Sequence, residues 1–278
     1  MEADLTLAQA KERVARERLR SLASVLVAYS GGVDSSYLLW LSRDVLRDRA
    51  VAFTALSAAV PADELEAARK LARSLGAEHV ERSSAEIEDP RYVRNEGDRC
   101  YFCKTELYTL ATSYAEANGI AAVVSGTNAD DLLDYRPGLA AASEHRIVHP
   151  LAEAKLSKAE IRILSRAVGL PTWDKPQQPC LASRIPYGTE VTRERLDQLA
   201  RAEMALRALG LREFRVRFHG EIARIEVADA ELSRLIAMRA EAARAVRQAG
   251  FRFASVDLEP FRSGRLNEAA GLVPLRSS

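Results

Sequence analysis

The sequence predicts an α/β protein whose parallel sheet is sandwiched by helices, followed by a smaller C-terminal α+β domain. Two observations predict this fold class. Through the first two-thirds of the chain, apolar β-rich runs alternate with helical patterns, as is typical of a parallel sheet with helices on both faces. After residue 191 the order changes to helix, two strands, helix and strand, which is typical of a separate α+β unit. The length of 278 residues suits one or two domains.

The first elements follow from hydrophobic periodicity and from end signals. The stretch MEADLTLAQAKERVARERLRS has the pattern of an amphipathic helix. Pro61 suits a helix start and Gly76 a helix end, and Ser157 with Glu160 predicts a capping box. We expect strands at 25–30, 50–56, 78–82 and 121–125, and helices at 33–46, 61–76, 103–118 and 157–168.

A loop-rich stretch, 171–191, separates the two parts and contains prolines 171, 176, 179 and 186. Beyond it we expect helix 192–209, strands 213–218 and 222–227, helix 229–249 and strand 252–258. The predicted boundary lies near residue 185, which gives domains 1–185 and 186–278.

The bulk composition excludes several classes of protein. A net charge of +1 creates no global field toward nucleic acid or a membrane. The N-terminus lacks the apolar core of a signal peptide, and no apolar run reaches the length of a membrane span. We therefore expect a cytoplasmic protein with no membrane partner and no stable nucleic-acid partner. Three cysteines in a chain of this size do not make a disulfide framework, so a chemical role is expected for them.

The stretch SGGVDSS, residues 30–36, lies between an expected strand and an expected helix. Glycines there permit φ > 0, and the free N–H groups of a helix N-terminus bind phosphate well. No lysine follows Gly32, so this is not a Walker loop built to hold a γ-phosphate for transfer. An ordinary capped βα turn is the alternative. The candidate phosphate-binding residues are Ser30, Gly31, Gly32, Asp34, Ser35 and Ser36.

A second polar loop, SGTNADD at 125–131, follows another expected strand. Ligands bind at the carboxyl ends of parallel strands, where both loops fall. Carboxylate oxygens suit Mg²⁺, which predicts a nucleotide with Mg²⁺ held by Asp34 and Asp131. Helix capping and solvation are the alternative role for Asp130 and Asp131. The candidate nucleotide-binding residues of this loop are Gly126, Thr127, Asn128 and Asp131.

With these residues the chain resembles known enzymes. SGGVDSS resembles the signature of the PP-loop ATP pyrophosphatases (adenine nucleotide alpha hydrolase-like fold), which cleave ATP between the α- and β-phosphates and adenylate an oxygen of their substrate. GDRCYFCKTELY (97–108) and PCLASRIPYGTEVT (179–192) extend the resemblance over about 15–265 to the LarE family. That resemblance implies an AMP-forming sulfur transferase that takes part in the biosynthesis of the nickel-pincer nucleotide, which is the cofactor of lactate racemase. It implies a pyridinium-3,5-biscarboxylate mononucleotide as substrate, a sulfide source as partner, and a homo-oligomer such as a hexamer.

The three cysteines are the expected catalytic residues. In the family the cysteine matching Cys180 can be a sacrificial sulfur donor, whereas this chain adds Cys100 and Cys103 as a C-x-x-C. The resemblance to a three-cysteine branch implies a [4Fe–4S] cluster held by all three, with one iron left open to carry sulfide. Sacrificial donation by Cys180, a redox pair and a Cys₃His zinc site are the alternatives.

The C-terminal domain offers a cationic constellation. In FRVRFHG the period-two pattern places Arg215, Arg217 and His219 on one face, and pairing with IARIEV would add Arg224 and Glu226. A solvated sheet face is the alternative. The resemblance implies that Arg215 and Arg217 bind the substrate phosphate and that Ser183 and Arg184 contact AMP or that phosphate. It also implies that Glu203 and Glu226 lie near the sulfur site as metal ligands.

Three other functions compete with this interpretation. A PP-loop tRNA thiolase would call for a strongly basic face or an appended RNA-binding domain. An ammonia-using synthetase would need no cysteine trio. A nucleotide-binding or electron-transfer module without turnover would release no pyrophosphate in the presence of substrate.

Overall fold

The computed structural model describes residues 2–133, 137–262 and 271. The chain forms two compact units. The first comprises residues 1–86 and 100–178, and the second comprises residues 87–99 and 179–278. The domain boundary near residue 185 stays a prediction.

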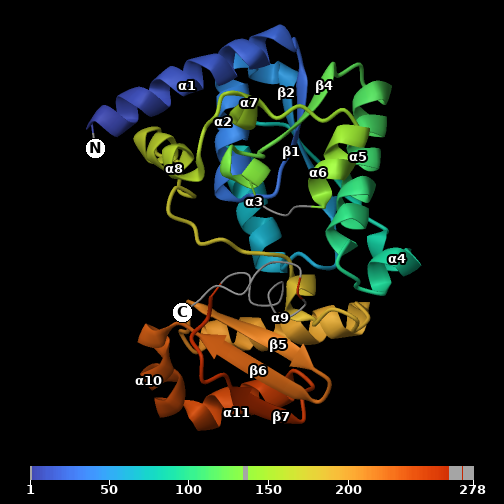
Figure 1. Cartoon of the computed structure of the whole chain (residues 1–278), viewed down its shortest axis with the longest axis vertical. Coiled ribbons are helices and arrows are strands. Elements are labelled where there is room, and N and C mark those ends of the chain that lie inside the picture. Colours follow the sequence, from blue (N-terminus) through green and yellow to red (C-terminus); the bar gives the residue numbers. More distant parts are fainter. Residues whose placement is uncertain (1, 134–136, 263–270, 272–278) are drawn as a thin grey trace. The chain divides into compact units, whose positions relative to one another are not determined.

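The first unit is built on a parallel sheet of strand order β3-β2-β1-β4. In the central strand, Val25 pairs with Ala50 on one side and with Ala122 on the other. Each strand leads through a helical connection to the next, as Figure 1 shows. The strands are β1 (Val25–Ala28), β2 (Ala50–Leu56), β3 (His79–Ser83) and β4 (Ala122–Ser125). The helices are α1 (Glu2–Ser21), α2 (Val33–Leu46), α3 (Ala62–Ser74), α5 (Arg99–Ala117), α6 (Gly138–Glu144), α7 (Pro150–Glu153) and α8 (Lys158–Ala167).

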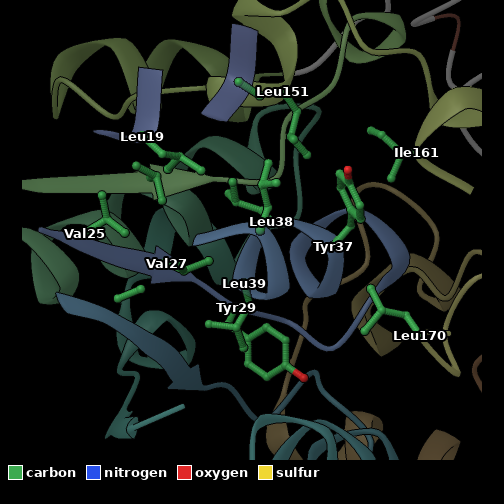
Figure 2. Close-up of a cluster of buried hydrophobic side chains, with 14 of the residues drawn as sticks. Leu19, Val25, Val27, Tyr29, Tyr37, Leu38, Leu39, Leu151, Ile161 and Leu170 are labelled. Atoms are coloured by element: carbon green, nitrogen blue, oxygen red, sulfur yellow. The ribbon is translucent and has the colours of Figure 1, made fainter. Parts of the chain in front are cut away.

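Alternate residues of β1 point into two different cores. Val25 and Val27 pack into a cluster with residues of α1, α2, α3 and α8, such as Leu19 and Leu38 (Figure 2). Leu26 packs into a second cluster with residues of α5 and α6. Because both faces of the sheet are covered by apolar helix faces, the predicted sandwich is confirmed.

The second unit holds a three-stranded sheet of order β5-β6-β7, in which β5 and β6 are antiparallel and β6 and β7 are parallel. Helix α9 packs on β5 and on α11. The elements are α4 (Pro90–Val93), the 3₁₀ turn η4 (Leu181–Arg184), α9 (Arg193–Ala208), β5 (Phe214–His219), β6 (Ile222–Val227), α10 (Asp229–Ala237), α11 (Arg239–Gln248) and β7 (Phe253–Val256).

The sequence located most elements but missed several boundaries. The expected helix 103–118 begins earlier, at Arg99, so both cysteines of the C-x-x-C are helical. The expected single helix 229–249 is wrong, because the chain leaves the helical region at Met238 (φ −101°, ψ 22°). No glycine or proline marks this break, and the short helices α4, α6 and α7 also lacked a periodic signal.

Within the described ranges, no helix is long and apolar enough to cross a membrane.

Candidate functional site

The phosphate loop between β1 and α2 is shaped by Gly31 and closed by serine hydroxyls. Gly31 has φ +71°, and a Cβ there would lie 2.7 Å from the Cβ of Ala68. The Ser30 amide donates to Ser35 Oγ at 3.2 Å, and the two hydroxyl oxygens lie 3.0 Å apart. Gly32 is the N-cap of α2 and Ser36 is fully buried. The loop is therefore a glycine-dependent turn at a helix N-terminus, the local structure that binds phosphate.

The second loop packs directly against the first. A Cβ on Gly126 would lie 2.8 Å from the amide nitrogen of Ser35, so only glycine allows this approach. Thr127 Oγ1 lies 2.9 Å from Ser125 Oγ, which lies 2.8 Å from His149 Nδ1. Burial is the main cause that lowers the pKa of His149 below its ordinary value, which favours a neutral ring. The structure thus brings the two predicted loops together.

Two buried polar atoms at this edge of the sheet have no hydrogen-bond partner. Asn128 Oδ1 accepts from the amides of Asp130 (3.0 Å) and Asp131 (3.2 Å), whereas its fully buried Nδ2 has no hydrogen-bond partner. Asp131 Oδ2 accepts from the Asn128 amide at 3.1 Å. Asp34 Oδ1 is also buried without a partner. An oxygen and an N–H in such positions fit a ligand that offers both a cation and an acceptor, as Mg²⁺ with a nucleotide does.

Two lysines at the phosphate loop were missed by sequence reasoning. Lys158 Nζ lies 3.0 Å from Asp34 Oδ2, and Lys175 Nζ donates to the Gly31 carbonyl at 3.1 Å. They follow the loop by more than a hundred residues, so no local motif could have found them.

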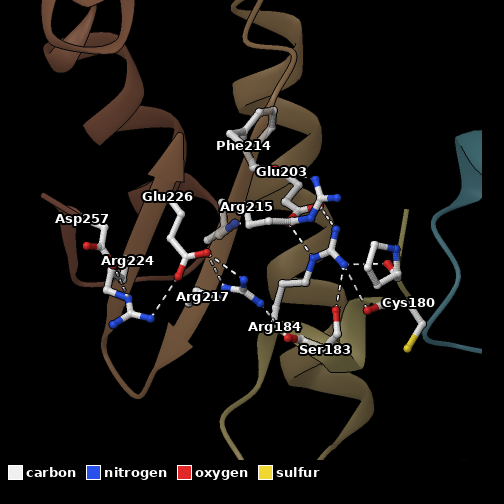
Figure 3. A network of polar contacts seen from close by, with 12 residues as sticks. Cys180, Ser183, Arg184, Glu203, Phe214, Arg215, Arg217, Arg224, Glu226 and Asp257 are labelled. Carbon is white, nitrogen blue, oxygen red and sulfur yellow. Dashed lines mark hydrogen bonds and ion pairs between the residues drawn. The ribbon is translucent and has the colours of Figure 1, made fainter. Parts of the chain in front are cut away.

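In the second unit, Arg184 braces the backbone that carries Cys180. Its Nε and Nη2 donate to Glu203 Oε1 and Oε2 at 2.9 and 3.1 Å. Its Nη1 donates to the carbonyls of Pro179 (2.6 Å) and Cys180 (3.1 Å) and to the Ser183 hydroxyl (3.0 Å), as Figure 3 shows. The Arg184 and Glu203 side chains are 1% and 3% exposed. The predicted contact of Arg184 with AMP or phosphate stays a prediction, because here the guanidinium binds the protein itself.

The paired strands β5 and β6 form the predicted cationic face, but solvent does not cover it. Arg215 pairs with Glu226 and Arg217 with Arg224 in the antiparallel register. Arg217 Nη1 donates to the Ser183 carbonyl at 2.8 Å, and its Nη2 lies 2.7 Å from Glu226 Oε2 (Figure 3). Glu226 is fully buried. The alternative of a solvated face is therefore wrong for Arg215, Arg217 and Glu226, which are buried, whereas His219 at the end of β5 is exposed.

Arg215 lies in an electropositive environment. Its guanidinium lies over the ring of Phe261, with 4.7 Å to the centroid. Burial, followed by the nearby charge of Arg184, lowers the pKa of Arg215 to about 10. The charge of Glu203 acts in the opposite direction, and those of Arg217 and Arg207 lower the pKa further. A bound anion would relieve this repulsion, so the cluster favours a phosphate or carboxylate.

Glu203 and Glu226 face guanidinium groups. Glu203 Oε1 also accepts from the Val216 amide at 3.1 Å, and Glu226 Oε1 lies 3.1 Å from Arg224 Nη2. Among the residues that the structure describes, no group of three or more His, Cys, Asp or Glu side chains is placed to hold a metal ion. The metal assignments, with Mg²⁺ at Asp34 and Asp131 and a further metal at these two glutamates, stay predictions.

The cysteines belong to different units. Cys100 lies in the first turn of α5 and is exposed, and Cys103 follows directly after that turn and is half-buried. Cys180 is half-buried in the second unit. The predicted cluster of three thiolates stays a prediction.

A polar clamp that sequence reasoning missed lies just before Cys100. The fully buried Asn95 donates through Nδ2 to the carbonyls of Ile185, Pro186 and Thr189 at 3.3, 2.8 and 2.9 Å. Arg99 Nη1 donates to the Ala182 carbonyl at 2.9 Å. The residue before Cys100 is therefore hydrogen-bonded to a residue two positions after Cys180. The polar run RNEGDRC was the available signal.

Comparison with known proteins gives matches over most of the chain. A family profile described as asparagine synthase matches residues 6–247. An uncharacterized protein of Synechocystis sp. is 43% identical over 254 residues, covering 91% of this chain and 95% of the relative. The pyridinium-3,5-bisthiocarboxylic acid mononucleotide synthase of Lactiplantibacillus plantarum is 38% identical over 251 residues, covering 90% and 91%. An uncharacterized protein of Methanocaldococcus jannaschii is 28% identical over 246 residues, covering 86% and 91%.

Proposed function

Since this chain belongs to the LarE family, within the broader family described as asparagine synthase, it is an ATP-dependent enzyme, and we propose that it is a sulfur transferase acting on pyridinium-3,5-biscarboxylic acid mononucleotide. The relative from L. plantarum is named for the corresponding bisthiocarboxylic acid, which favours a pyridinium mononucleotide over tRNA as the substrate.

The proposed reaction has two steps for each carboxylate. First, a carboxylate oxygen attacks the α-phosphorus of ATP, the bond to the β-phosphoryl oxygen breaks, and pyrophosphate leaves with the electron pair. Second, sulfide attacks the acyl carbon and AMP leaves, which gives the thiocarboxylate. An ionised carboxylate needs no general base for the first step, in keeping with a chain that has four histidines.

One observation carries the proposal: the backbone around Cys180 shares a hydrogen-bonded network with Arg184 and Arg217, which we propose bind an anion. Arg184 holds the carbonyl of Cys180, and Arg217 holds the carbonyl of Ser183 three residues later. A mononucleotide phosphate bound at Arg215 and Arg217 would place the rest of the substrate next to the sulfur-bearing loop. Arginine forks suit such a phosphate.

The donor chemistry also fits an iron–sulfur cluster. A [4Fe–4S] cluster would be held by the thiolates of Cys100, Cys103 and Cys180 and would supply the sulfide. The hydrogen bond from Arg99, the residue before Cys100, to the carbonyl of Ala182, two residues after Cys180, supports this assignment. Donation of the Cys180 sulfur itself is the alternative. We further propose a cytoplasmic homo-oligomer that draws on a separate sulfide source.

The test is anaerobic turnover of the full-length protein. With ATP, Mg²⁺ and the pyridinium biscarboxylic acid mononucleotide, we expect thiocarboxylate, AMP and pyrophosphate by mass spectrometry and enzymatic assay. Pyrophosphate release without the mononucleotide, or none with it, would contradict the proposal.

The sulfur source is tested by metal content and protein mass. About four irons per chain, lost in both Cys100→Ala and Cys180→Ala, would support the cluster. Absence of iron, together with loss of H₂S from Cys180 after one turnover, would establish the sacrificial alternative. Ser113→Ala, on the distal part of α5, serves as the matched control.

A further inference from the structure

Residues 87–99 form a segment, which we call the strap, that leads directly into Cys100. The strap belongs to the second unit, whereas the residues on either side of it in the sequence belong to the first. Consecutive Cα atoms lie about 3.8 Å apart, so the position of Arg99 fixes where the backbone of Cys100 starts. The contacts that hold the strap therefore decide where the first of the three cysteines lies.

Backbone hydrogen bonds tie the strap to the segment that follows Cys180. The Val191 amide donates to the Val93 carbonyl at 2.9 Å, and the Gly188 amide donates to the Asn95 carbonyl at 3.0 Å. Asn95 has φ +56°, a left-handed conformation that asparagine adopts more readily than most residues. Its buried side chain binds the same segment through the three carbonyls described above. The strap is thus anchored before the chain reaches Cys100.

Arg99 adds a buried, charged contact at the end of the strap, where it is 5% exposed. Its Nη1 donates to Asn95 Oδ1 and, at 2.9 Å, to the Ala182 carbonyl. Its guanidinium carbon lies 5.8 Å from the ring centroid of Tyr187. Taking a guanidinium out of water costs free energy that an apolar side chain at this position would not cost. An arginine buried directly before Cys100 therefore points to a role in placing that cysteine.

The loop that carries Cys180, residues 179–183, is held by arginines from three places in the second unit. Arg184 and Arg217 donate to three carbonyls of this loop (Figure 3). Arg99 donates to a fourth carbonyl, that of Ala182, and it is the member of this set that comes from the strap. Its side chain therefore couples the backbone that enters Cys100 to the backbone that carries Cys180.

We propose that Arg99, held in place by Asn95, positions Cys100 beside Cys180 before any cluster is bound. This inference rests on the proposed function, in which the cysteines act together in sulfur delivery. Arg99 is a positioning residue, because it acts through the backbone of the two cysteine-bearing segments. Thiolates that are already close together lose less conformational freedom when they bind a common group. The contact therefore favours capture of a cluster by Cys100 and Cys180 together.

The test measures the proximity of the two thiols without iron, ATP or substrate. The full chain with Cys103→Ala, reduced and freed of iron by a chelator, serves as the parent and keeps only Cys100 and Cys180. Dibromobimane alkylates one thiol and becomes fluorescent when it closes onto the second, and mass spectrometry identifies the joined peptides. The first-order rate of closure, divided by the second-order rate of alkylation with monobromobimane, gives the effective concentration of one thiol at the other.

In the parent we expect closure to join Cys100 to Cys180. Arg99→Leu should lower the effective concentration about tenfold or more, because it removes a hydrogen bond from a charged group. Arg99→Lys keeps a cation with hydrogen-bond donors but lacks the planar fork, so we expect it to recover part of the loss. A change in the exposure of the thiols alone alters both rates together and cancels in their ratio.

A second arginine of the strap provides the matched control. The Arg94 side chain is 58% exposed and lies 3.9 Å from a carboxylate oxygen of Glu96, so Arg94→Leu should leave the effective concentration at the value of the parent. Circular dichroism checks that each variant folds. If Arg99→Leu does not fold, the comparison between Arg99→Lys and Arg94→Leu decides the question.

Two results would overturn the role of Arg99: no closure between Cys100 and Cys180 in the parent, or the same effective concentration in the Arg99 variants as in Arg94→Leu. Neither result depends on turnover. If the effective concentration falls as expected but the wild type binds no iron and makes no thiocarboxylate, the proposed function fails while the positioning by Arg99 stands. In iron-loaded protein with all three cysteines, Arg99→Leu should also speed the loss of iron to a chelator.

Discussion

Replacing Arg184 by leucine tests the buried brace under Cys180. The substitution removes both bonds to Glu203 and those to the carbonyls of Pro179 and Cys180. It leaves the Glu203 carboxylate, 3% exposed, without its charged partner. Breaking a buried ion pair on one side costs about 3–5 kcal/mol, so we expect the second unit to lose stability by that amount.

Hydrogen exchange resolved by peptide measures this loss within one unit. Peptides of β5 should exchange roughly two to three orders of magnitude faster, because each 1.4 kcal/mol is about tenfold. Peptides of α2, in the first unit, provide the internal control. The double substitution Arg184→Leu with Glu203→Leu removes both charges and should recover much of the stability. It should not recover the ordinary alkylation rate of Cys180, whose carbonyl has lost the Arg184 guanidinium and keeps the Ser183 amide as a donor.

The reasoning is refuted if Arg184→Leu lowers the free energy of unfolding by less than about 1 kcal/mol, because removing one partner of a fully buried ion pair leaves the other charge buried without compensation. It also fails if the double substitution destabilises β5 as much as the sum of the two single ones.

Three further predictions concern other parts of the chain. Gly31→Ala places a side chain at φ +71° and against Ala68, so we expect a loss of about 1–3 kcal/mol in thermal unfolding, with weaker ATP binding. Burial lowers the pKa of His149 below 6.5 in the folded protein, so the stability that the neutral ring contributes is complete above pH 6.5 and declines as the pH falls through the folded pKa. His149→Gln should therefore flatten the pH dependence of the free energy of unfolding in that window, and an unchanged slope would contradict this prediction. Asn95→Ala removes the side-chain donor from the carbonyls of Ile185, Pro186 and Thr189, of which only that of Pro186 is also seen to accept from an amide, that of Thr189. The substitution should cost about 2–4 kcal/mol, read from faster exchange at residues 185–189, whereas exchange at the wild-type rate would refute the clamp.

Local patterns were enough to predict the phosphate loop and the sheet. Gly31 and Gly126 are required by backbone conformation and by close approach, constraints that act within a few residues of a strand end. The strands of the first unit were predicted from short apolar runs, whose side chains must be buried on both faces of a sheet. The break at Met238 escaped prediction because no residue type marks it.

The period-two pattern of FRVRFHG also placed Arg215 and Arg217 on one face and was confirmed by the pairing with β6. The pattern could not predict what covers that face. A period of two shows which residues share one side of a strand, whereas their burial depends on which distant segment packs against that side. Here that segment includes Ser183, whose carbonyl accepts a hydrogen bond from Arg217.

Residue types over short stretches of the chain account for the fold class, the glycine-dependent phosphate loop and the kinds of side chain available for sulfur chemistry. Tertiary packing is what makes Arg184 and Glu203 a buried brace under Cys180 and brings Lys158 and Lys175 to the phosphate loop. Those contacts join residues 19 to 144 positions apart, and such pairs meet only because packed helices and strands bring them together.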